Sequence, residues 1–328
     1  MAFSEIIGQK IPLATLRLAL GNNRLHHAYL FTGPAGVGKR ATALAVAMAL
    51  HCVERNGDFC GHCVECARVQ ARNHPDVREI EPVTGKKEIS IQQIREMEKE
   101  LHYHSFSGGR KIAIIDPATL LNHASQNALL KTLEEPPQGS LLILISSSAG
   151  ALLPTLRSRC LRLNFGPIPP PLLAGFLMSK KGQAPKEAEF LAALSMGSIG
   201  AALDMDGDES RKRRRQWVST LSELKKGNYQ GALEAAEALA SSREEVLAFL
   251  EWAESWYHDL LTHRLQQNAR DVVNLDMLAE LQQQAAEATV GRILSAATHA
   301  ASATRKIQRN LNRRMVLEEF LFGVVGSQ

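Results

Sequence analysis

Residues 28–40 read AYLFTGPAGVGKR, and this stretch decides the fold class. The apolar run at residues 28–32 predicts a short buried strand, and the Ala- and Leu-rich residues 39–50 predict a helix. Between them, the pattern G-x-x-x-x-G-K is typical of a phosphate-binding loop, in which glycines let backbone N–H groups surround phosphate oxygens. A strand, a glycine-rich loop and a helix in this order predict a nucleotide-binding α/β domain.

The loop supplies four candidate nucleotide ligands. Gly33, Gly36 and Gly38 would present backbone N–H groups, and the ammonium group of Lys39 would offset the charge of the outer phosphates. The alternative is a structural turn that has kept its glycines without binding anything. Binding of ATP or ADP therefore stays open on this evidence.

Predicted strands and helices alternate after the loop. Short apolar runs predict strands at residues 80–82, 111–116 and 141–146. A polar cap at Ser90 begins one helix, and a second spans residues 120–135, where two prolines end it. Such alternation implies a mostly parallel sheet that is covered by helices on both faces.

The sequence GPIPPP at residues 166–171 ends the α/β pattern. We expect three domains: an α/β domain at residues 1–166, a small helical domain at 167–206 and an all-α domain at 207–328. The last of these consists of amphipathic segments, which are typical of a bundle or an oligomerisation module.

Composition and charge narrow the class of protein only modestly. The chain has 328 residues, a net charge of +4 and a pI of about 8.8. This mild basic excess permits contact with nucleic acid but does not argue for it. No apolar run reaches the ~18 residues of a membrane span, and residues 1–10 lack a secretion signal. We therefore expect a soluble, cytoplasmic protein with no membrane partner.

Four of the five cysteines cluster in one short segment and are the candidate metal ligands: Cys52, Cys60, Cys63 and Cys66. Their spacing predicts a structural zinc site, because four thiolates complete a tetrahedral shell and leave no position open for water. Disulfides at these positions would conflict with a reducing cytosol.

The neighbouring histidines and the fifth cysteine have simpler interpretations. His51 and His62 are competing zinc ligands, but four thiolates suffice, so we expect both histidines at the surface. Cys160 lies far along the chain and is expected to be a small buried hydrophobic residue.

Two positions that ATP hydrolysis needs carry unsuitable residues. The Ser or Thr that normally follows the loop lysine binds Mg²⁺, but Arg40 stands here and has no lone pair to offer a metal. Asp116 follows a predicted strand, where a carboxylate can hold magnesium. The next residue, Pro117, supplies no base to activate water. We expect no efficient hydrolysis by this chain alone.

Further motifs accompany the loop and the cysteines: FSEIIGQ at residues 3–9, HAYLF at 27–31, NALLKTLEEPP at 127–137 and LPTLRSRC at 153–160. Together they resemble the delta-prime subunits of the bacterial DNA polymerase III clamp loader, which are AAA+ proteins. The resemblance is dense up to about residue 205 and architectural beyond it. It implies an AAA+ P-loop domain with an inserted zinc module at about residues 52–66, then a helical lid domain and an all-α collar domain.

The resemblance assigns a role to Arg159, the arginine of Ser-Arg-Cys. In this family it acts as an arginine finger in trans: its planar, permanently charged guanidinium reaches the nucleotide of a neighbouring subunit. The implied partners are the gamma/tau and delta subunits of a hetero-oligomeric ring, which brings the sliding clamp and primer-template DNA together. The chain would then be part of the DNA polymerase III holoenzyme, a nucleotidyltransferase complex that acts in DNA replication at the replisome.

Departures from the motor subunits favour the delta-prime type. Where motors keep a Ser/Thr, an Asp-Glu pair and a sensor arginine in Gly-Ser-x-Arg, this chain has Arg40, Pro117 and Gly200. One alternative is a catalytically active, gamma/tau-like ATPase. Another is a stand-alone zinc or nucleic-acid-binding module.

Three other features have two interpretations each. Ser146 ends a predicted strand and is either a weak nucleotide sensor or part of a simple turn. The basic run RKRRR at residues 211–215 either contacts phosphates or opens a solvated helix. Trp252, Trp256 and Tyr257 fall at helical spacing and belong either to a core or to an interface.

Overall fold

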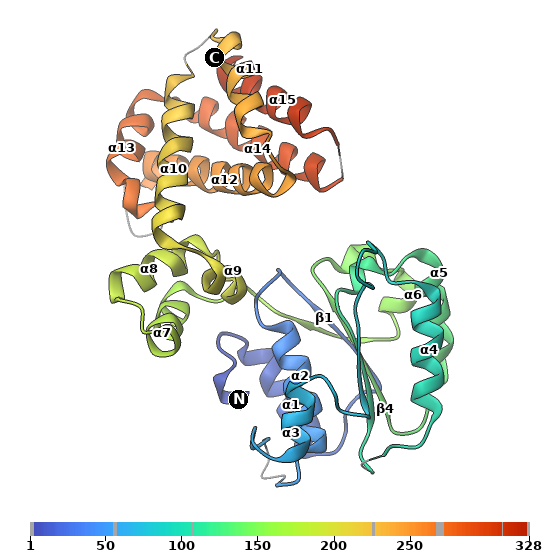
Figure 1. Cartoon of the computed structure of the whole chain (residues 1–328). Coiled ribbons are helices and arrows are strands. Elements are labelled where there is room, and N and C mark those ends of the chain that lie inside the picture. The colour runs from blue at the N-terminus through green and yellow to red at the C-terminus, as the bar shows by residue number, and fades with distance from the viewer. Residues whose placement is uncertain are drawn as a thin grey trace. The chain divides into compact units, whose positions relative to one another are not determined.

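The computed structural model describes residues 3–54, 58–106, 108–224, 227–266, 272–309 and 311–326. These residues form two compact units, Met1–Asp204 and Met205–Gln328 (Figure 1). The first unit is α/β and the second is helical. A further division of the first unit at residue 166, into an α/β domain and a lid, stays a prediction.

The first unit is built on a parallel sheet that has five strands among its described residues, in the order β2-β3-β4-β1-β5. The strands are β1 (Ala28–Thr32), β2 (Val77–Ile80), β3 (Lys111–Ile115), β4 (Ser140–Ser146) and β5 (Leu161–Asn164). Every residue of β1, β3 and β4 is buried, because helices cover both faces of the sheet. The mostly parallel α/β architecture expected from the sequence is confirmed.

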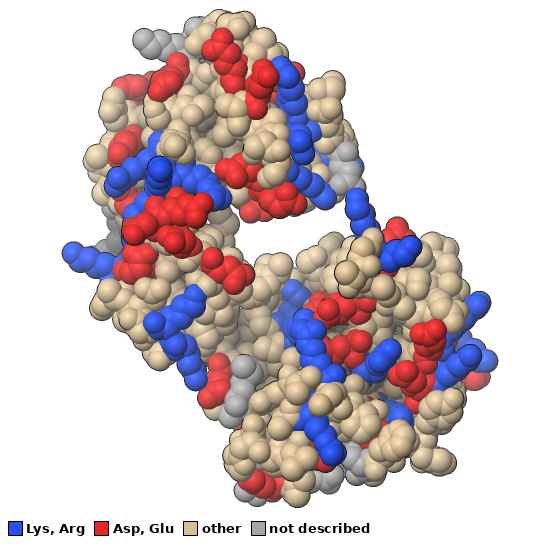
Figure 2. All heavy atoms as spheres, in the orientation of Figure 1, with Lys and Arg blue, Asp and Glu red and all other residues tan. Residues whose placement is uncertain are grey.

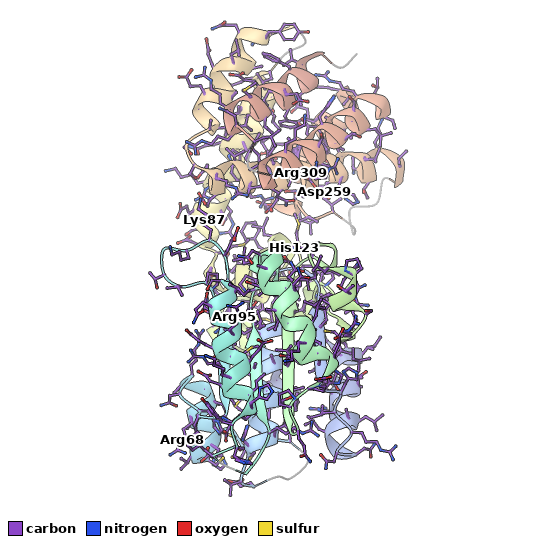
Figure 3. The ribbon with its side chains drawn as sticks, turned by 90° about the vertical axis from the view of Figure 1, so that its right-hand side faces the viewer. Arg68, Lys87, Arg95, His123, Asp259 and Arg309 are labelled. Carbon is purple, nitrogen blue, oxygen red and sulfur yellow. The ribbon has the colours of Figure 1, made fainter. Side chains whose placement is uncertain are left out.

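Helices cover the two faces as two separate layers (Figure 1). One layer holds α1 (Lys10–Gly21), α2 (Lys39–His51) and α3 (Val64–Gln70), and the other holds α4 (Ile91–His102), α5 (His123–Glu134) and α6 (Pro154–Arg157). Neighbouring side chains of β1 point to opposite faces of the sheet: Phe31 packs in the core under α1, α2 and α3, and Leu30 packs in the core under α4, α5 and α6. In Figure 3, α4 with Arg95 and α5 with His123 at its start lie side by side.

Two predicted boundaries need correction. The strand expected at residues 80–82 is β2, which starts at Val77 because Val77 pairs in register with Ile112 of β3. The helix expected from residue 120 is α5, which starts after Asn122, whose side chain accepts a hydrogen bond from the Ser125 N–H at 2.9 Å.

The start of α4 at Ser90 is confirmed and has a clear cause. The Ser90 hydroxyl accepts a hydrogen bond from the Gln93 backbone N–H, and the Gln93 side chain accepts one from the Ser90 backbone. This reciprocal capping box satisfies two backbone donors at the beginning of the helix.

Short helices complete the first unit: α7 (Pro170–Lys181), α8 (Pro185–Leu194) and α9 (Ile199–Asp204). Prolines occupy the first helical positions of α7 and α8, where their missing N–H and fixed φ favour a helix start. The start of α9 packs against the phosphate-binding loop, as described below.

The second unit is all-α over its described residues. Its α-helices are α10 (Gly207–Glu223), α11 (Tyr229–Leu239), α12 (Arg243–Gln266), α13 (Leu278–Glu287), α14 (Val290–Gln308) and α15 (Arg313–Gly326). Trp252, Trp256 and Tyr257 of α12 are all buried in its core, and the two indole rings stack with centroids 5.7 Å apart. Within the described residues, no helix combines the length and apolar character that crossing a membrane requires.

One arginine of the basic run at residues 211–215, Arg214, is buried in the second unit. Arg214 is only 3% exposed, and its Nη2 lies 3.0 Å from Asp276 Oδ1 and 2.5 Å from Asn274 Oδ1. The expectation of a wholly solvated basic face is therefore wrong for Arg214, which is a buried ion-pair partner. On the face drawn in Figure 2, basic and acidic side chains intermingle over both units.

Candidate functional site

The phosphate-binding loop connects the carboxyl end of β1 to α2, as its motif predicts. Its glycines are required by shape: a Cβ at Gly33 would lie 2.0 Å from the Phe165 carbonyl oxygen, and one at Gly36 would lie 2.0 Å from Ser198 Oγ. Gly36 and Gly38 have φ values of 71° and 97°, in the left-handed region that favours glycine. A side chain is thus excluded at Gly33 by the Phe165 backbone, and at Gly36 and Gly38 it would strain the backbone.

Lys39 is held inside the loop. Its side chain is buried, and its Nζ donates a hydrogen bond to the Gly33 carbonyl at 2.6 Å and another to the Pro34 carbonyl. Burial lowers the pKa of Lys39, and the nearby carboxylate of Asp116 partly offsets this effect. The structure thus brings Asp116, which directly follows β3, close to the loop lysine.

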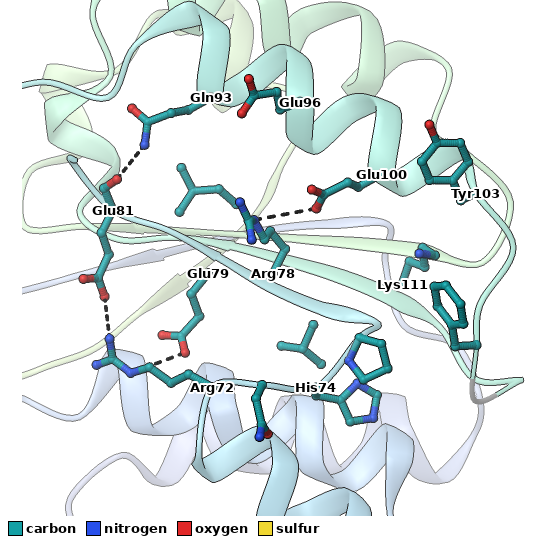
Figure 4. A pocket seen from close by; sticks show the side chains of 15 residues that line it. Arg72, His74, Arg78, Glu79, Glu81, Gln93, Glu96, Glu100, Tyr103 and Lys111 are labelled. Atoms are coloured by element: carbon teal, nitrogen blue, oxygen red, sulfur yellow. Dashed lines mark hydrogen bonds and ion pairs between the residues drawn. The ribbon is translucent and has the colours of Figure 1, made fainter.

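Arg40 lies in an ion-pair network at the carboxyl end of β2. Its Nε and Nη2 donate to Glu79 Oε2 at 3.1 and 2.5 Å, and its Nη2 lies 2.6 Å from Glu81 Oε1. Arg72 joins the same two carboxylates at 3.6 and 3.4 Å, as the dashed lines in Figure 4 show. Burial acts against the charged form, but Glu79 and Glu81 raise the pKa of Arg40 above its ordinary value.

Glu79, Glu81 and Arg72 were not identified from the sequence. The available signal was the spacing of the two glutamates, since residues two apart on a strand point to the same side. Their partner Arg40 lies 39 residues from Glu79, so the pairing itself is visible only in the fold.

Asp116 and Ser146 lie at the carboxyl ends of β3 and β4, the same edge of the sheet from which the loop leaves β1. Burial raises the pKa of Asp116, and Arg40 counteracts this effect. The Ser146 hydroxyl donates to the Ser148 carbonyl at 2.6 Å and accepts from the Ser148 N–H at 3.1 Å. Both hydrogen bonds are internal to one turn, which is the simpler of the two interpretations of Ser146.

The segment Gly197-Ser198-Ile199-Gly200 lies directly on the phosphate-binding loop. The Gly200 N–H donates to the Gly36 carbonyl at 3.2 Å, and a Cβ at Gly200 would lie 3.4 Å from the Gly36 Cα. A side chain at position 200 would therefore begin beside the loop, but glycine supplies no side chain there.

Arg159 lies at the opposite end of the sheet. It precedes β5, and its Nη1 donates to the Thr155 carbonyl at 2.8 Å while its Nη2 lies 2.7 Å from Glu134 Oε1 at the end of α5. The end of α5 lies beside the amino end of β1, since His27 Nε2 is 3.2 Å from the Leu133 carbonyl. The five-residue strand β1 separates this end from the loop by roughly 16 Å, at about 3.3 Å per residue.

The four cysteines predicted as metal ligands come together in the structure. Their sulfurs all lie within 4.8 Å of one another, and Cys52 Sγ is 3.7 Å from Cys60 Sγ. Tetrahedral zinc with Zn–S bonds of about 2.3 Å places its sulfurs about 3.8 Å apart, so this donor set fits the ion. None of the five cysteines, all of which are described, forms a disulfide.

Backbone N–H groups further prepare this cluster for a cation. The Cys60 N–H donates to Cys52 Sγ at 3.4 Å, and the Cys63 N–H donates to Cys60 Sγ at 3.2 Å. Burial raises the pKa values of Cys60 and Cys66, whereas at Cys63 hydrogen bonds from the backbone at Cys66 and Val53 outweigh burial and lower the pKa to about 6. A lowered thiol pKa favours the thiolate, which is the form that binds metal.

The expected positions of the remaining candidates are partly corrected. His62 is 72% exposed, as predicted, but His51 is buried and its ring packs on His74 at 4.2 Å, so its surface placement was wrong. Cys160 is partly buried against the apolar core beneath α5, and this burial raises its pKa to about 12.

Comparisons with known proteins agree over both units. One family model, described as DNA polymerase III, delta subunit, matches residues 8–169, and a second, described as its C-terminal part, matches residues 208–324. A DNA polymerase III subunit delta' from Pseudomonas aeruginosa is 34% identical over 311 residues, covering 92% of this chain and 93% of that protein. One from Escherichia coli is 32% identical over 308 residues, covering 92% and 89%.

A relative named as a different subunit matches only part of the chain. The DNA polymerase III subunit tau/gamma of Haemophilus influenzae is 37% identical over 163 residues, which are 49% of this chain and 23% of that protein. The delta' subunits of Pseudomonas aeruginosa and Escherichia coli match along about nine-tenths of their length, and the two family models described as delta subunit match residues in both units. This chain belongs to the family of DNA polymerase III delta' subunits.

Proposed function

We propose that this chain acts as the delta' subunit of a clamp loader in DNA replication. It assembles with gamma/tau and delta subunits into a ring that loads the sliding clamp onto primed DNA. Within that ring it donates Arg159 to the ATP site of a neighbour and does not itself hydrolyse ATP. The observation that carries the proposal is the ion-paired Arg40 at its own phosphate-binding loop.

Arg40 removes the conditions for a metal-dependent reaction. Mg²⁺ requires oxygen ligands, and a guanidinium offers only donors and a positive charge. The carboxylates of Glu79 and Glu81, which are the nearest acidic groups on β2 and just beyond it, already bind Arg40 and Arg72. Because Pro117 follows Asp116, the residue directly after this carboxylate has no side chain that can act as the base.

The position of Arg159 supports action in trans. Strand β1 separates it from the loop of its own chain, so it cannot serve that loop without a large rearrangement. Its side chain is 36% exposed and its partner Glu134 is 52% exposed. Ion pairs at such exposure contribute about 0–1 kcal/mol, so a phosphate group of higher charge can displace the carboxylate.

The zinc site fits a structural role. Four thiolates fill the coordination shell and leave no open position, so a zinc ion there would stabilise the segment between α2 and α3. The ion itself would take no part in the phosphate chemistry.

Reconstitution with gamma/tau and delta subunits tests the proposal. Arg159→Ala should reduce turnover at the neighbour's site by roughly a thousandfold, the scale of a lost arginine finger, and should impair clamp loading. Arg78→Ala is the matched control, because Arg78 is another exposed arginine of the same unit that pairs with a single glutamate, Glu100.

Two results would overturn the proposal. Unchanged ATPase and clamp loading with Arg159→Ala would remove the finger role. Mg²⁺-dependent ATP turnover by the isolated wild-type chain would favour the gamma/tau-like ATPase instead.

A further inference from the structure

We propose that the zinc module acts as a clamp on the N-terminal segment, residues 3–9, and thereby holds one wall of the phosphate-binding loop in place. The inference rests on the zinc site of the proposed function, and it adds a purpose for that site. Three sets of contacts carry it.

The first set joins the start of the N-terminal segment to the zinc module. The Phe3 backbone N–H lies 3.3 and 3.2 Å from the two carboxylate oxygens of Asp58, and Asp58 Oδ1 also accepts from the Phe59 N–H at 2.8 Å. Asp58 lies two residues before the candidate zinc ligand Cys60. A metal-bound loop thus presents a charged acceptor to the start of the segment.

The second set is an aromatic contact at the same place. The rings of Phe3 and Phe59 meet edge to face with centroids 5.5 Å apart, and both residues are almost fully buried, at 1% and 4% exposure. Arg17 of α1 lies 5.6 Å from the centroid of the Phe3 ring and 3.8 Å from Asp58 Oδ2. The zinc module, the N-terminal segment and α1 therefore share one packed cluster.

The third set joins the end of the N-terminal segment to the phosphate-binding loop. The buried Gln9 amide donates to the Val37 carbonyl at 3.1 Å and to the Gly166 carbonyl at 2.8 Å, and its oxygen accepts from the Gly166 N–H at 3.2 Å. Ile6, between the two ends, packs close to Gly38: a Cβ there would be 3.8 Å from Ile6 Cγ2.

The metal dependence follows from the lack of regular secondary structure around Asp58 and Phe59. Asp58 and Phe59 lie between Cys52 and Cys60, and no helix or strand is assigned among the described residues from 52 to 63. Zinc bound to the flanking thiolates would fix this short loop, as structural zinc does in small domains that fold on binding metal. Loss of the ion should therefore release the segment at Phe3 first.

Hydrogen exchange of the full-length chain, measured by mass spectrometry together with its zinc content, tests this clamp. In the zinc-loaded protein, Asp58→Ala and Phe59→Ala should leave about one zinc per chain. Exchange at residues 3–20 should become about tenfold faster, as expected when a local opening equilibrium shifts. Glu54→Gln is the control, since Glu54 is in the same module but its carboxylate lies 3.6 Å from the exposed His62 ring. Phe59→Leu provides a milder change if the alanine variant does not fold.

Removal of zinc from the reduced wild-type protein should accelerate exchange in the same residues while the second unit keeps its protection. Unchanged exchange at residues 3–20, both in the variants and after zinc removal, would overturn the inference. If reduced, unchelated protein contains no zinc, the zinc site of the proposed function fails, and the metal dependence of the clamp fails with it. Zinc present without an effect on exchange would leave the zinc site in place and refute the clamp alone.

Discussion

The two ends of the parallel sheet each carry an arginine paired with glutamate, but the pairs differ in kind. At the phosphate-binding end, Arg40 binds both Glu79 and Glu81, and Glu79 is only 11% exposed. At the opposite end, Arg159 meets one glutamate, Glu134, that is 52% exposed. The two arginines therefore differ in the number and burial of their partners rather than in charge, and under the proposed function this difference would leave Arg159 available to another protein.

The largest effect that sharpens this comparison is expected at Arg159. Arg159→Lys keeps the charge but loses the planar fork of donors, so turnover at the neighbouring ATP site should fall by roughly a thousandfold in the reconstituted complex. Arg78→Lys serves as control, because Arg78 is another surface-exposed arginine. Full activity with Arg159→Lys would show that only charge matters at this end of the sheet.

Glu79→Ala should have the next largest effect, on stability. It removes the acceptor of two Arg40 hydrogen bonds and leaves that guanidinium short of partners, which should lower the free energy of unfolding by about 1–3 kcal/mol. Urea unfolding followed by circular dichroism measures the change. Tryptophan fluorescence reports unfolding of the second unit alone, since the sequence's three tryptophans, Trp217, Trp252 and Trp256, all lie there. It therefore distinguishes a change in the first unit, where Glu79 lies, from a change in the second.

The control for Glu79→Ala is Glu100→Ala, which breaks an exposed pair with Arg78. Glu79, Arg78 and Glu100 all line the pocket drawn in Figure 4. Equal destabilisation by the two variants would contradict the distinction between a partly buried network and a surface pair.

A smaller effect is expected from Arg40→Thr, which restores a hydroxyl at the metal-binding position. Mg²⁺ should then strengthen nucleotide binding by roughly 1 kcal/mol, the scale of one added ligand contact. ATP turnover should stay at background because Pro117 is unchanged. Titration of the variant with a fluorescent ATP analogue, with and without Mg²⁺, measures this. Robust hydrolysis by this single variant would show that Arg40 alone blocks the reaction.

The smallest effect is expected from Glu134→Gln. The exposed pair with Arg159 should contribute no more than about 1 kcal/mol to the stability of the isolated chain. Urea unfolding under the same conditions checks this value. A loss as large as that of Glu79→Ala would make the two ends of the sheet equivalent and remove the basis of the comparison.

Much of the fold was predictable because its central strands are mostly apolar. The strands β1, β3 and β4 are buried along their whole length, and the glycine-rich loop marks the connection from β1 to α2. The edge strand β5 was missed because only Leu163 of its four residues is buried, so it has no apolar run. Strand β2 was displaced for the same reason, since only Ile80 in it is buried.

The candidate site was predictable where ligands lie close together in sequence. The cysteine cluster is local and its spacing alone indicates a metal site, whereas the partners of Arg40 and Arg159 lie on elements distant in the chain. The buried Arg214 did carry a signal. Arg214, Trp217, Val218 and Leu221 follow helical spacing and are all buried, so the arginine belongs to an inward-facing stripe.

The network around Arg40 also has an evolutionary consequence. Restoring the metal-binding hydroxyl would leave Glu79 and Glu81 to Arg72 alone, and restoring a base after Asp116 would gain nothing while Arg40 repels the metal. A hydroxyl residue at position 40 alone would thus lower stability, and a base at position 117 alone would not improve metal binding. If the chain does not hydrolyse ATP, as proposed, the pairing of Arg40 with Glu79 and Glu81 would make that state hard to reverse by single substitutions.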